Sequence, residues 1–276
     1  MAAKPMAVAL ALIMVSACAA HTSMEAEAMG DGALFVDDFS SGMDAWAHEG
    51  DGAYRVAVED GRLAVTPDNG SYGGVNVWCR TALPEEFHLE FDCVPLKQMA
   101  NLVFMFAASQ LDGRDLVADH AVRNGHYAWI TNKEGAFSYK SKTIEDKRIP
   151  PIACYTISYW FPNKSRPAGR VPARKNPGHL LVADGPRPGA EDANGLPIRF
   201  AITKRGGRIV FAKNAEVVFD ITDDGGQEVE AITKSEDGTL EKEPYIMPVY
   251  GGGYFGFRSL HAWVAFDNVR VTRPAE

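Results

Sequence analysis

From Leu34 to the C-terminus, the sequence is a series of short apolar segments that turn residues interrupt. Most segments alternate apolar with polar residues, are rich in Val, Phe, Tyr and Ile, and end at Gly, Pro, Asn or Asp, which is typical of β-strands. No segment keeps an amphipathic helical period for three turns. Many short strands joined by such turns predict an all-β sandwich or barrel. Clear examples are YRVAVED, FHLEFDCV, NLVFMFAA, CYTISYWF, IRFAITKRG, EVVFDIT and WVAFDNVRV.

The two ends of this series refine the expected architecture. The opening LFVDDFSSGMDAWAHEG and the closing GGYFGFRSLHAWVAFDNVRV form a pair that resembles the concanavalin A-like jelly rolls, in which the first and last strands lie side by side. The resemblance implies a sandwich of two antiparallel sheets, with a convex back and a concave front that typically binds glycans. No internal repeat or second compositional zone is present, so we expect residues 33–274 to form one such domain. Long polar insertions at residues 109–150 and 162–178 are the kind that builds a binding site on a rigid scaffold.

The N-terminus has the pattern of an export signal. Lys4 precedes an apolar run from Met6 to Val15, which is too short to span a bilayer and is typical of a signal peptide. The run ends in VSAC, which resembles a bacterial lipobox and implies cleavage before Cys18 and a lipid on its thiol. We therefore expect a signal peptide at residues 1–17 and a flexible tether at residues 18–32. An ordinary signal peptide cut near SACAA is the alternative.

Both interpretations place the protein outside the cytoplasm. With Cys18 lipidated, we expect it in the periplasm or at the outer membrane, touching the membrane only through its lipid anchor. The formal charge of −8 excludes nucleic acid as the main partner, because duplex binding needs a broad basic surface.

Three further cysteines, Cys79, Cys93 and Cys154, lie in strand-like apolar segments. An odd number of cysteines cannot be fully paired, and their spacing matches no zinc site. We therefore expect them to be small buried hydrophobic residues.

Several motifs of catalysis are missing from the sequence, including the G-x-S-x-G elbow, a glycine-rich phosphate loop and a His/Cys metal cluster. Retaining glucanases of the concanavalin type need two carboxylates that flank the scissile bond. The nearest match is Glu90 and Asp92 in HLEFD, but a third acid at the right offset is absent. We expect these two side chains on an outer face, and a glycoside hydrolase remains a lesser alternative.

Alternating faces suggest where a ligand could contact the strands. Asn76, Trp78 and Arg80 share one face of GVNVWCR, where an aromatic ring with polar neighbours would suit a sugar; an ordinary solvent face fits equally well. In CYTISYWF, either the set with Tyr155 and Tyr159 or the alternate set could face the core. A lone histidine such as His179 is more often structural than catalytic.

Four segments together resemble the YesU-like family of bacterial concanavalin-type proteins. They are RNGHYAWI, CYTISYWF, RKNPGHLLVADGPRP and GFRSLHAWVAFDNV. The resemblance covers most of the mature chain and implies an acidic oligosaccharide or polysaccharide ligand that contains uronic acid, as in rhamnogalacturonan or ulvan. The segment PNKSRPAGRVPA departs from the family pattern, so the loop contacts there do not follow from the resemblance.

A uronic acid suggests β-elimination, by a carbon–oxygen lyase or a dehydratase. This chemistry needs a cation that neutralises the carboxylate, a base for the C5 proton and an acid for the leaving group. We expect Arg174 and Arg258 as clamps, His179 as base and Tyr155 as acid. The expected substrate-binding residues are Trp78, Arg80, Arg123, His126, Tyr159 and Lys175, of which His126 and Lys175 are further candidates for the base and Tyr159 for the acid. The rival hypothesis is a glycan-binding protein without catalysis.

We expect no cofactor. The aspartates Asp37, Asp38 and Asp267 would lie near one another if the terminal strands pair, and a structural calcium ion there is an open alternative. We favour solvated aspartates at strand ends. The segment TDDGG at residues 222–226 is interpreted as a turn.

Overall fold

The computed structural model describes residues 32–50, 54–67, 74–97, 100–118, 125, 128–133, 151–162, 169–235, 237 and 239–275. The expected signal peptide, the lipid-bearing Cys18 and almost all of the tether lie outside the described residues. In the described part of the chain, no helix has the length and apolar character needed to cross a membrane.

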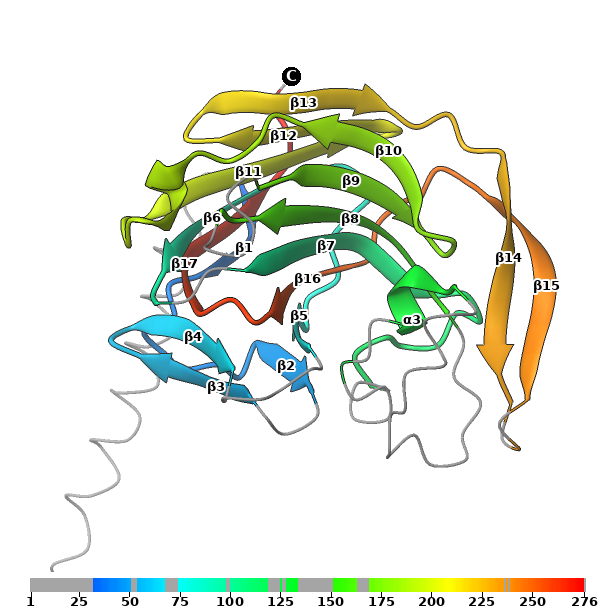
Figure 1. Ribbon diagram of the computed structural model, residues 1–276, viewed down its shortest axis with the longest axis horizontal. Coiled ribbons are helices and arrows are strands. Elements are labelled where there is room, and N and C mark those ends of the chain that lie inside the picture. The colour runs from blue at the N-terminus through cyan, green and yellow to red at the C-terminus, as the bar shows by residue number, and fades with distance from the viewer. Residues whose placement is uncertain are drawn as a thin grey trace, which may run out of the picture.

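Two large antiparallel sheets account for most of the described residues (Figure 1). Both large sheets pair strands that are far apart in the sequence, and the eight-stranded sheet has β1 attached to β17 beside its main path. The eight-stranded sheet has the order β13 (Glu216–Thr222), β12 (Arg208–Lys213), β11 (Ile198–Arg205), β6 (Phe87–Pro95), β17 (Val264–Thr272), β4 (Arg62–Pro67) and β3 (Tyr54–Glu59), with β1 (Ala33–Asp37). The seven-stranded sheet has the order β10 (Leu180–Gly185), β9 (Val171–Asn176), β8 (Ile152–Trp160), β7 (Asn101–Gln110), β16 (Tyr254–Leu260), β5 (Val75–Cys79) and β2 (Trp46–Glu49).

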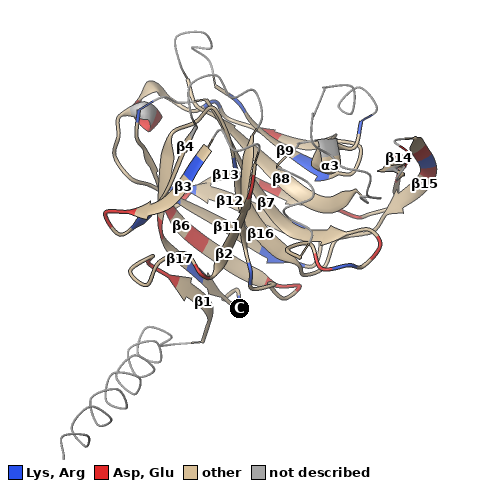
Figure 2. Ribbon diagram, turned by 90° about the horizontal axis from the view of Figure 1, so that it is seen from below, with Lys and Arg blue, Asp and Glu red and all other residues tan. Residues whose placement is uncertain are grey.

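A separate two-stranded ribbon consists of β14 (Gln227–Lys234) and β15 (Leu240–Met247). It projects beside the sandwich in Figure 1, and it carries both acidic and basic residues in Figure 2. The described helices are short: the single turn α3 (Ala128–Thr131) and the 3-10 helix η1 (Ala190–Ala193). Figure 1 shows α3 beneath the curved ends of β7 and β8.

Aromatic side chains fill the space between the two sheets. The alternation in β6 turns Phe91 inward, where its ring centroid lies 5.1 Å from that of Phe104 and 4.9 Å from that of Phe257, both on the seven-stranded sheet. Phe257 also stacks on Phe266 at 3.9 Å. Such ring pairs add about 0.5–1.5 kcal/mol each to the burial of their apolar area. The period-2 pattern of the sequence thus predicts correctly which face of β6 is the core.

The predicted jelly roll is confirmed, including its terminal strands. The first strand β1 pairs antiparallel with the last strand β17, with Val36 opposite Arg270. The three described cysteines are free and buried, as expected. Burial raises the pKa of the Cys79 thiol to about 12.

The inner strands β5, β7, β8 and β16 of the seven-stranded sheet are buried on both faces. The outer face of this sheet carries a second apolar cluster, in which residues of β5, β7 and β8 pack against α3 and residues 116–117. Trp78 of β5 and Trp129 of α3 are the largest members, with exposed fractions of 0% and 1%. Polar side chains on this outer face therefore sit beside an apolar layer, where charges and hydrogen bonds count for more than in water.

Candidate functional site

The pairing of β8 with β9 decides which of the predicted site residues can meet a ligand. Successive side chains of a strand point to opposite faces. Tyr155 pairs with Lys175, and Thr156 pairs with Arg174. Tyr155 belongs to the core cluster between the sheets, so Lys175 also points inward. Thr156 and Arg174 consequently lie on the outer face of the seven-stranded sheet.

Tyr155 and Lys175 form a buried polar cluster around Asp223. The Lys175 Nζ lies 2.7 Å from Asp223 Oδ2 and donates to Gln227 Oε1 at 2.9 Å. The Tyr155 hydroxyl donates to the same Asp223 oxygen. Burial alone would raise the pKa of Asp223, but the hydrogen bonds from Lys175 and Tyr155 lower it below its usual value. This ion pair attaches β9 to the base of the β14–β15 ribbon.

Tyr159 has a similar internal role at the other end of β8. Its hydroxyl donates to Asp192 Oδ2 at 2.8 Å, and Lys213 Nζ lies 2.9 Å from Asp192 Oδ1. Burial, with a further contribution from Asp192, raises the pKa of Tyr159 well above its usual range.

The predicted roles of Tyr155, Tyr159 and Lys175 therefore need correction. The three side chains face the core and saturate buried carboxylates, so they cannot contact a ligand on the outer face of the sheet. The sequence left both faces of β8 open, because each alternate set contains apolar residues. The acids that decide the matter, Asp192 and Asp223, come from η1 and from the turn after β13. The TDDGG segment therefore does more than turn the chain.

Two cationic side chains, Arg174 and Lys133, lie near enough to His179 at the β9–β10 turn to contribute to the lowering of its pKa. We call these three residues the cationic cluster: Arg174 of β9, His179 of the β9–β10 turn and Lys133 after α3. The Gly178 N–H donates to the Thr131 carbonyl at 2.9 Å, which holds the turn that carries His179 against the segment that carries Lys133. His179 adopts a left-handed backbone with φ 58°, a conformation that is uncommon for residues other than glycine.

The pKa of His179 reflects both its burial and the charges of the cationic cluster. Burial lowers the pKa of His179 to about 4, and the positive charges of Arg174 and Lys133 contribute to the shift. His179 is therefore neutral at pH 7. An imidazole with this pKa is a weak base, because efficient general bases have a pKa near the working pH.

Asn176 lies on the same outer face, two residues after Arg174. Its Nδ2 donates to Thr156 Oγ1 at 3.2 Å. Its Oδ1 is buried and has no hydrogen-bond partner among the described residues. A buried acceptor without a partner costs about 1–3 kcal/mol, and a hydroxyl or a water molecule is the kind of donor that would satisfy it.

A second polar group crosses β2, β5 and β16 on the same face of the sheet. Glu49 Oε1 accepts from Asn76 Nδ2 at 2.8 Å and from Trp78 Nε1 at 2.9 Å. Arg258 Nη1 donates to Asn76 Oδ1 at 2.8 Å and to the Gly125 carbonyl. We call these four residues the Glu49 cluster; the sequence did not single out its carboxylate.

The Glu49 cluster is too enclosed to stack a sugar on its tryptophan. Trp78 has no exposed surface, and its ring lies over Gly256, where an added Cβ would meet Trp78 Cε3 at 2.7 Å. Arg258 is only 4% exposed and connects the loop at Gly125 to the sheet. The predicted sugar-stacking role of Trp78 is therefore wrong for this arrangement, and the predicted clamp role of Arg258 stays a prediction.

Of the remaining predicted residues, Arg80 is exposed and its Nε donates to the Trp46 carbonyl at 3.2 Å. It lines a surface hollow of about 280 Å³ at β2. Arg123 and His126 lie outside the described residues. The two predicted arginine clamps, Arg174 and Arg258, share one face but are three strands apart, which separates them by about 14 Å across the sheet, and they are offset by two residues along the strands.

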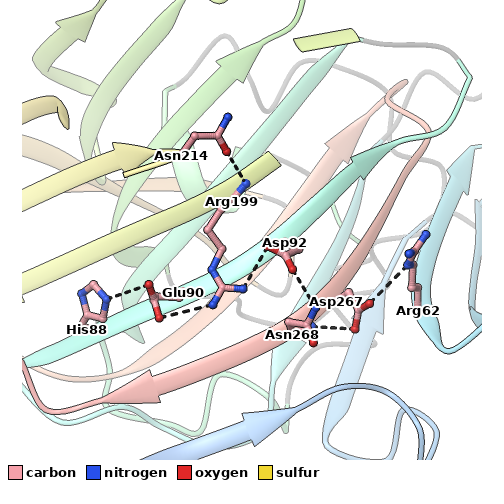
Figure 3. A network of polar contacts seen from close by, with 8 residues as sticks. All are labelled: Arg62, His88, Glu90, Asp92, Arg199, Asn214, Asp267 and Asn268. Atoms are coloured by element: carbon pink, nitrogen blue, oxygen red, sulfur yellow. Dashed lines mark hydrogen bonds and ion pairs between the residues drawn. The ribbon is translucent and has the colours of Figure 1, made fainter. Parts of the chain in front are cut away.

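The acids Glu90 and Asp92 point outward from the eight-stranded sheet, as expected. Figure 3 shows them in a network of polar contacts on the sandwich's other side. Arg199 Nη1 donates to Asp92 Oδ1 at 3.1 Å, and Asp267 pairs with Arg62 at 3.4 Å. In the part of the chain that the structure describes, no group of three His, Cys, Asp or Glu side chains could hold a metal ion. The calcium alternative stays untested.

Comparison with solved structures identifies proteins of similar fold. A protein of unknown function with a galectin-like fold from Bacillus subtilis is 20% identical, with a TM-score of 0.66 over 88% of this chain and 96% of that chain. A protein from a study of endo-acting O-glycanases, which human gut microbiota express to initiate mucin breakdown, is 13% identical, with a TM-score of 0.51 over 88% of this chain and 100% of that chain. At these identities the likeness shows the fold alone.

Sequence comparison adds the family. A search of curated protein sequences gave no match. Residues 33–271 match the family model described as a domain of unknown function, DUF1961, which spans β1 and nearly all of β17 and therefore the whole sandwich. The chain thus belongs to the DUF1961 family.

Proposed function

We propose that the protein binds acidic saccharides of the uronic-acid class on the outer face of the seven-stranded sheet, with Arg174 as the partner of the sugar carboxylate. The observation that carries this proposal is the convergence of Arg174, His179 and Lys133 from three separate segments of an acidic chain. A planar guanidinium can hold a carboxylate through two parallel hydrogen bonds, which gives both strength and orientation.

The side chains beside Arg174 on the same outer face are polar. Asn176, Thr156 and Ser158 are buried, with exposed fractions of 0%, 1% and 4%, so they support the sheet surface beneath a ligand and do not offer it hydrogen bonds. His179, which is neutral at pH 7, and the exposed Lys133 complete the surroundings of Arg174.

Binding is proposed ahead of β-elimination because both tyrosines that were predicted as proton donors face the core. Tyr155 and Tyr159 face the core and donate to Asp223 and Asp192. His179 is a weak base because burial, and to a lesser extent the charges of Arg174 and Lys133, lower its pKa. A bound carboxylate would offset these charges and raise the pKa of His179, so elimination is retained as an arm of the test.

The wider context is also proposed. One protein of similar fold is named with glycanases of mucin breakdown, so a glycan is a reasonable ligand class for this scaffold. The acidic nature of the ligand rests on this chain's own cationic cluster. We propose further that the protein is exported and anchored through a lipid on Cys18, which would present this face to polysaccharides outside the cytoplasm.

Calorimetric titration of the full chain with oligogalacturonate and with a neutral galactose oligomer of equal length tests the proposal. Arg174→Gln should weaken binding of the acidic oligomer by about 10- to 100-fold, the equivalent of one charge-assisted hydrogen bond. The neutral oligomer should change little. Arg170→Gln is the matched control. It removes the same charge, but Arg170 is exposed and pairs with Asp184 at 3.1 Å.

Absorbance of unsaturated uronate, with mass spectrometry, is followed in the same samples. Equal loss of affinity for both oligomers would mean that Arg174 is only part of the scaffold. New unsaturated ends would change the assignment to elimination with chain cleavage, and loss of water without cleavage would indicate a dehydratase. The absence of binding to acidic oligomers of any backbone would refute the proposal.

A further inference from the structure

The outer face of the eight-stranded sheet contains a hollow that the proposed function does not use. Its volume is about 500 Å³, within the range of small-molecule sites. Four strands and the chain after β17 build it. Its lining residues are His88, Thr203, Arg205, Arg208, Val210, Thr272, Pro274 and Ala275.

Short side chains make the floor of this hollow. Val210, Thr203, His88 and Thr272 lie opposite one another in a row across β12, β11, β6 and β17. All four are partly exposed, as expected for the outward positions of alternating strands. The floor therefore combines apolar surface with hydroxyl groups.

Two arginines stand at the walls of the hollow, and the charge of one of them, Arg208, is offset by an ion pair with Asp220. Asp220 holds Arg208 through two hydrogen bonds of 2.9 and 2.6 Å, which fixes the guanidinium in place. Arg205 is exposed, and no hydrogen bond or ion pair joins its guanidinium to a described residue. His88 Nδ1 lies 2.7 Å from Thr203 Oγ1, which fixes the imidazole ring. No acid is among the lining residues.

We infer that this hollow is a second ligand site, which takes a carboxylate-bearing sugar with Arg205 as the partner of the carboxylate. The ring's apolar face would rest on Val210 and Pro274, and its hydroxyl groups would bond to Thr203 and Thr272. A guanidinium beside an apolar floor with hydroxyls fits a sugar acid better than a simple inorganic anion, which needs no floor. The inference is independent of the cationic cluster, which lies on the other sheet.

Two histidines give the two sites separate reporters in one experiment. The full chain, with labelled imidazoles, is titrated with D-glucuronate while nuclear magnetic resonance follows His88 in the hollow and His179 in the cationic cluster. D-Glucose and sodium sulfate at equal ionic strength are the matched probes. We expect saturable shifts of the His88 signals with glucuronate, and no saturable shifts with glucose or sulfate.

Variants assign the response to the hollow. Arg205→Gln should weaken the His88 response at least tenfold, and Arg174→Gln should leave it unchanged. Removal of residues 274–276 takes away the wall at Pro274 and should weaken the response several-fold without touching the sheet. Unfolding midpoints confirm that all three variants are folded.

Several results would overturn the second site. These are equal shifts with sulfate, no saturable His88 response, or an unchanged response in Arg205→Gln. If glucuronate shifts the His88 signals but not the His179 signals, the result counts against the proposed function and leaves the second site standing.

Discussion

Replacing Lys175 with methionine tests the structural reason for removing it from the ligand site. The ammonium has no exposed surface and lies 2.7 Å from Asp223. Methionine keeps the length of the side chain but leaves the Asp223 carboxylate buried without a cation. Breaking a buried pair in this way costs about 3–5 kcal/mol. Because Tyr155 and the Gly225 N–H still donate to Asp223, we expect about 3 kcal/mol in the free energy of unfolding at pH 7.

Urea unfolding measures this cost, and thermal unfolding should show a midpoint lower by about 6–12 °C. Arg170→Met is the control: its ion pair with Asp184 is exposed, so it should cost less than about 1 kcal/mol. The double variant Lys175→Met/Asp223→Asn should recover most of the loss, because neither charge remains buried. Equal costs for Lys175→Met and Arg170→Met would refute the argument that Lys175 is a buried structural cation.

The pH dependence of the same variant provides a second check. Asp223 has a lowered pKa in the native protein, so its contribution is present above the ordinary pKa of 3.8 and is lost as the pH falls through the folded value. Without Lys175, burial should raise the pKa of Asp223 instead. The difference between the two proteins should therefore narrow as the pH falls from 7 towards 4. A difference that stays constant over this range would mean that charge is not the cause.

Three further predictions follow from single contacts. Gly256→Ala should lower the free energy of unfolding in urea by at least about 2 kcal/mol, because the new Cβ would meet the Val77 carbonyl at 2.5 Å. The control Gly251→Ala, whose new Cβ would have no atom within 4 Å, should change it by less than about 0.5 kcal/mol. Nuclear magnetic resonance of the imidazole should give His179 a pKa near 4, and this pKa should move towards 6.5 in Arg174→Ala. Because the pKa of His179 is lower in the folded than in the unfolded protein, this histidine should lower the stability of the fold as the pH falls from 6.5 to 4. In a Cys18→Ser protein, no thiol should react with a disulfide reagent until denaturant is added, because burial raises the pKa of all three described cysteines; rapid reaction of the native protein would contradict that burial.

The fold could be predicted because its signals are local. Alternation within FHLEFDCV identifies Phe87, Leu89 and Phe91 as inward and Glu90 and Asp92 as outward, and the structure has this pattern. The length and spacing of the segments similarly predict a sandwich. These features depend on neighbours within one strand, which a single sequence contains.

The composition of the site could not be predicted in the same way. Both alternate sets of β8 are apolar enough for a core, because this strand is covered on both faces. The buried partner of the Tyr155 hydroxyl is Asp223, which is 68 residues away in the sequence. Likewise Glu49 bonds Asn76 across 27 residues and Trp78 across 29. Only the pairing of strands brings these groups together, and periodicity carries no information about that pairing.

The basic segment around β9 shows what this means for function. Arg174 and Lys175 are adjacent in the sequence and look like one positive patch, but neighbours on a strand lie on opposite faces. Lys175 is neutralised by Asp223 within the core, and of the two cations only Arg174 points to the outer face. Its neighbours then come from elsewhere: the neutral His179 from the following turn and the cationic Lys133 from the segment after α3. Two sets of hydrogen bonds connect the cationic cluster with the ribbon. The Gly178–Thr131 bond joins the β9–β10 turn to the segment after α3, and the bonds between Asn132 and the Ile232 backbone join that segment to β14. The position of this segment would therefore affect how a carboxylate binds at Arg174. Ligand affinity should consequently depend on the β14–β15 ribbon, although the ribbon contributes no residue to the cationic cluster.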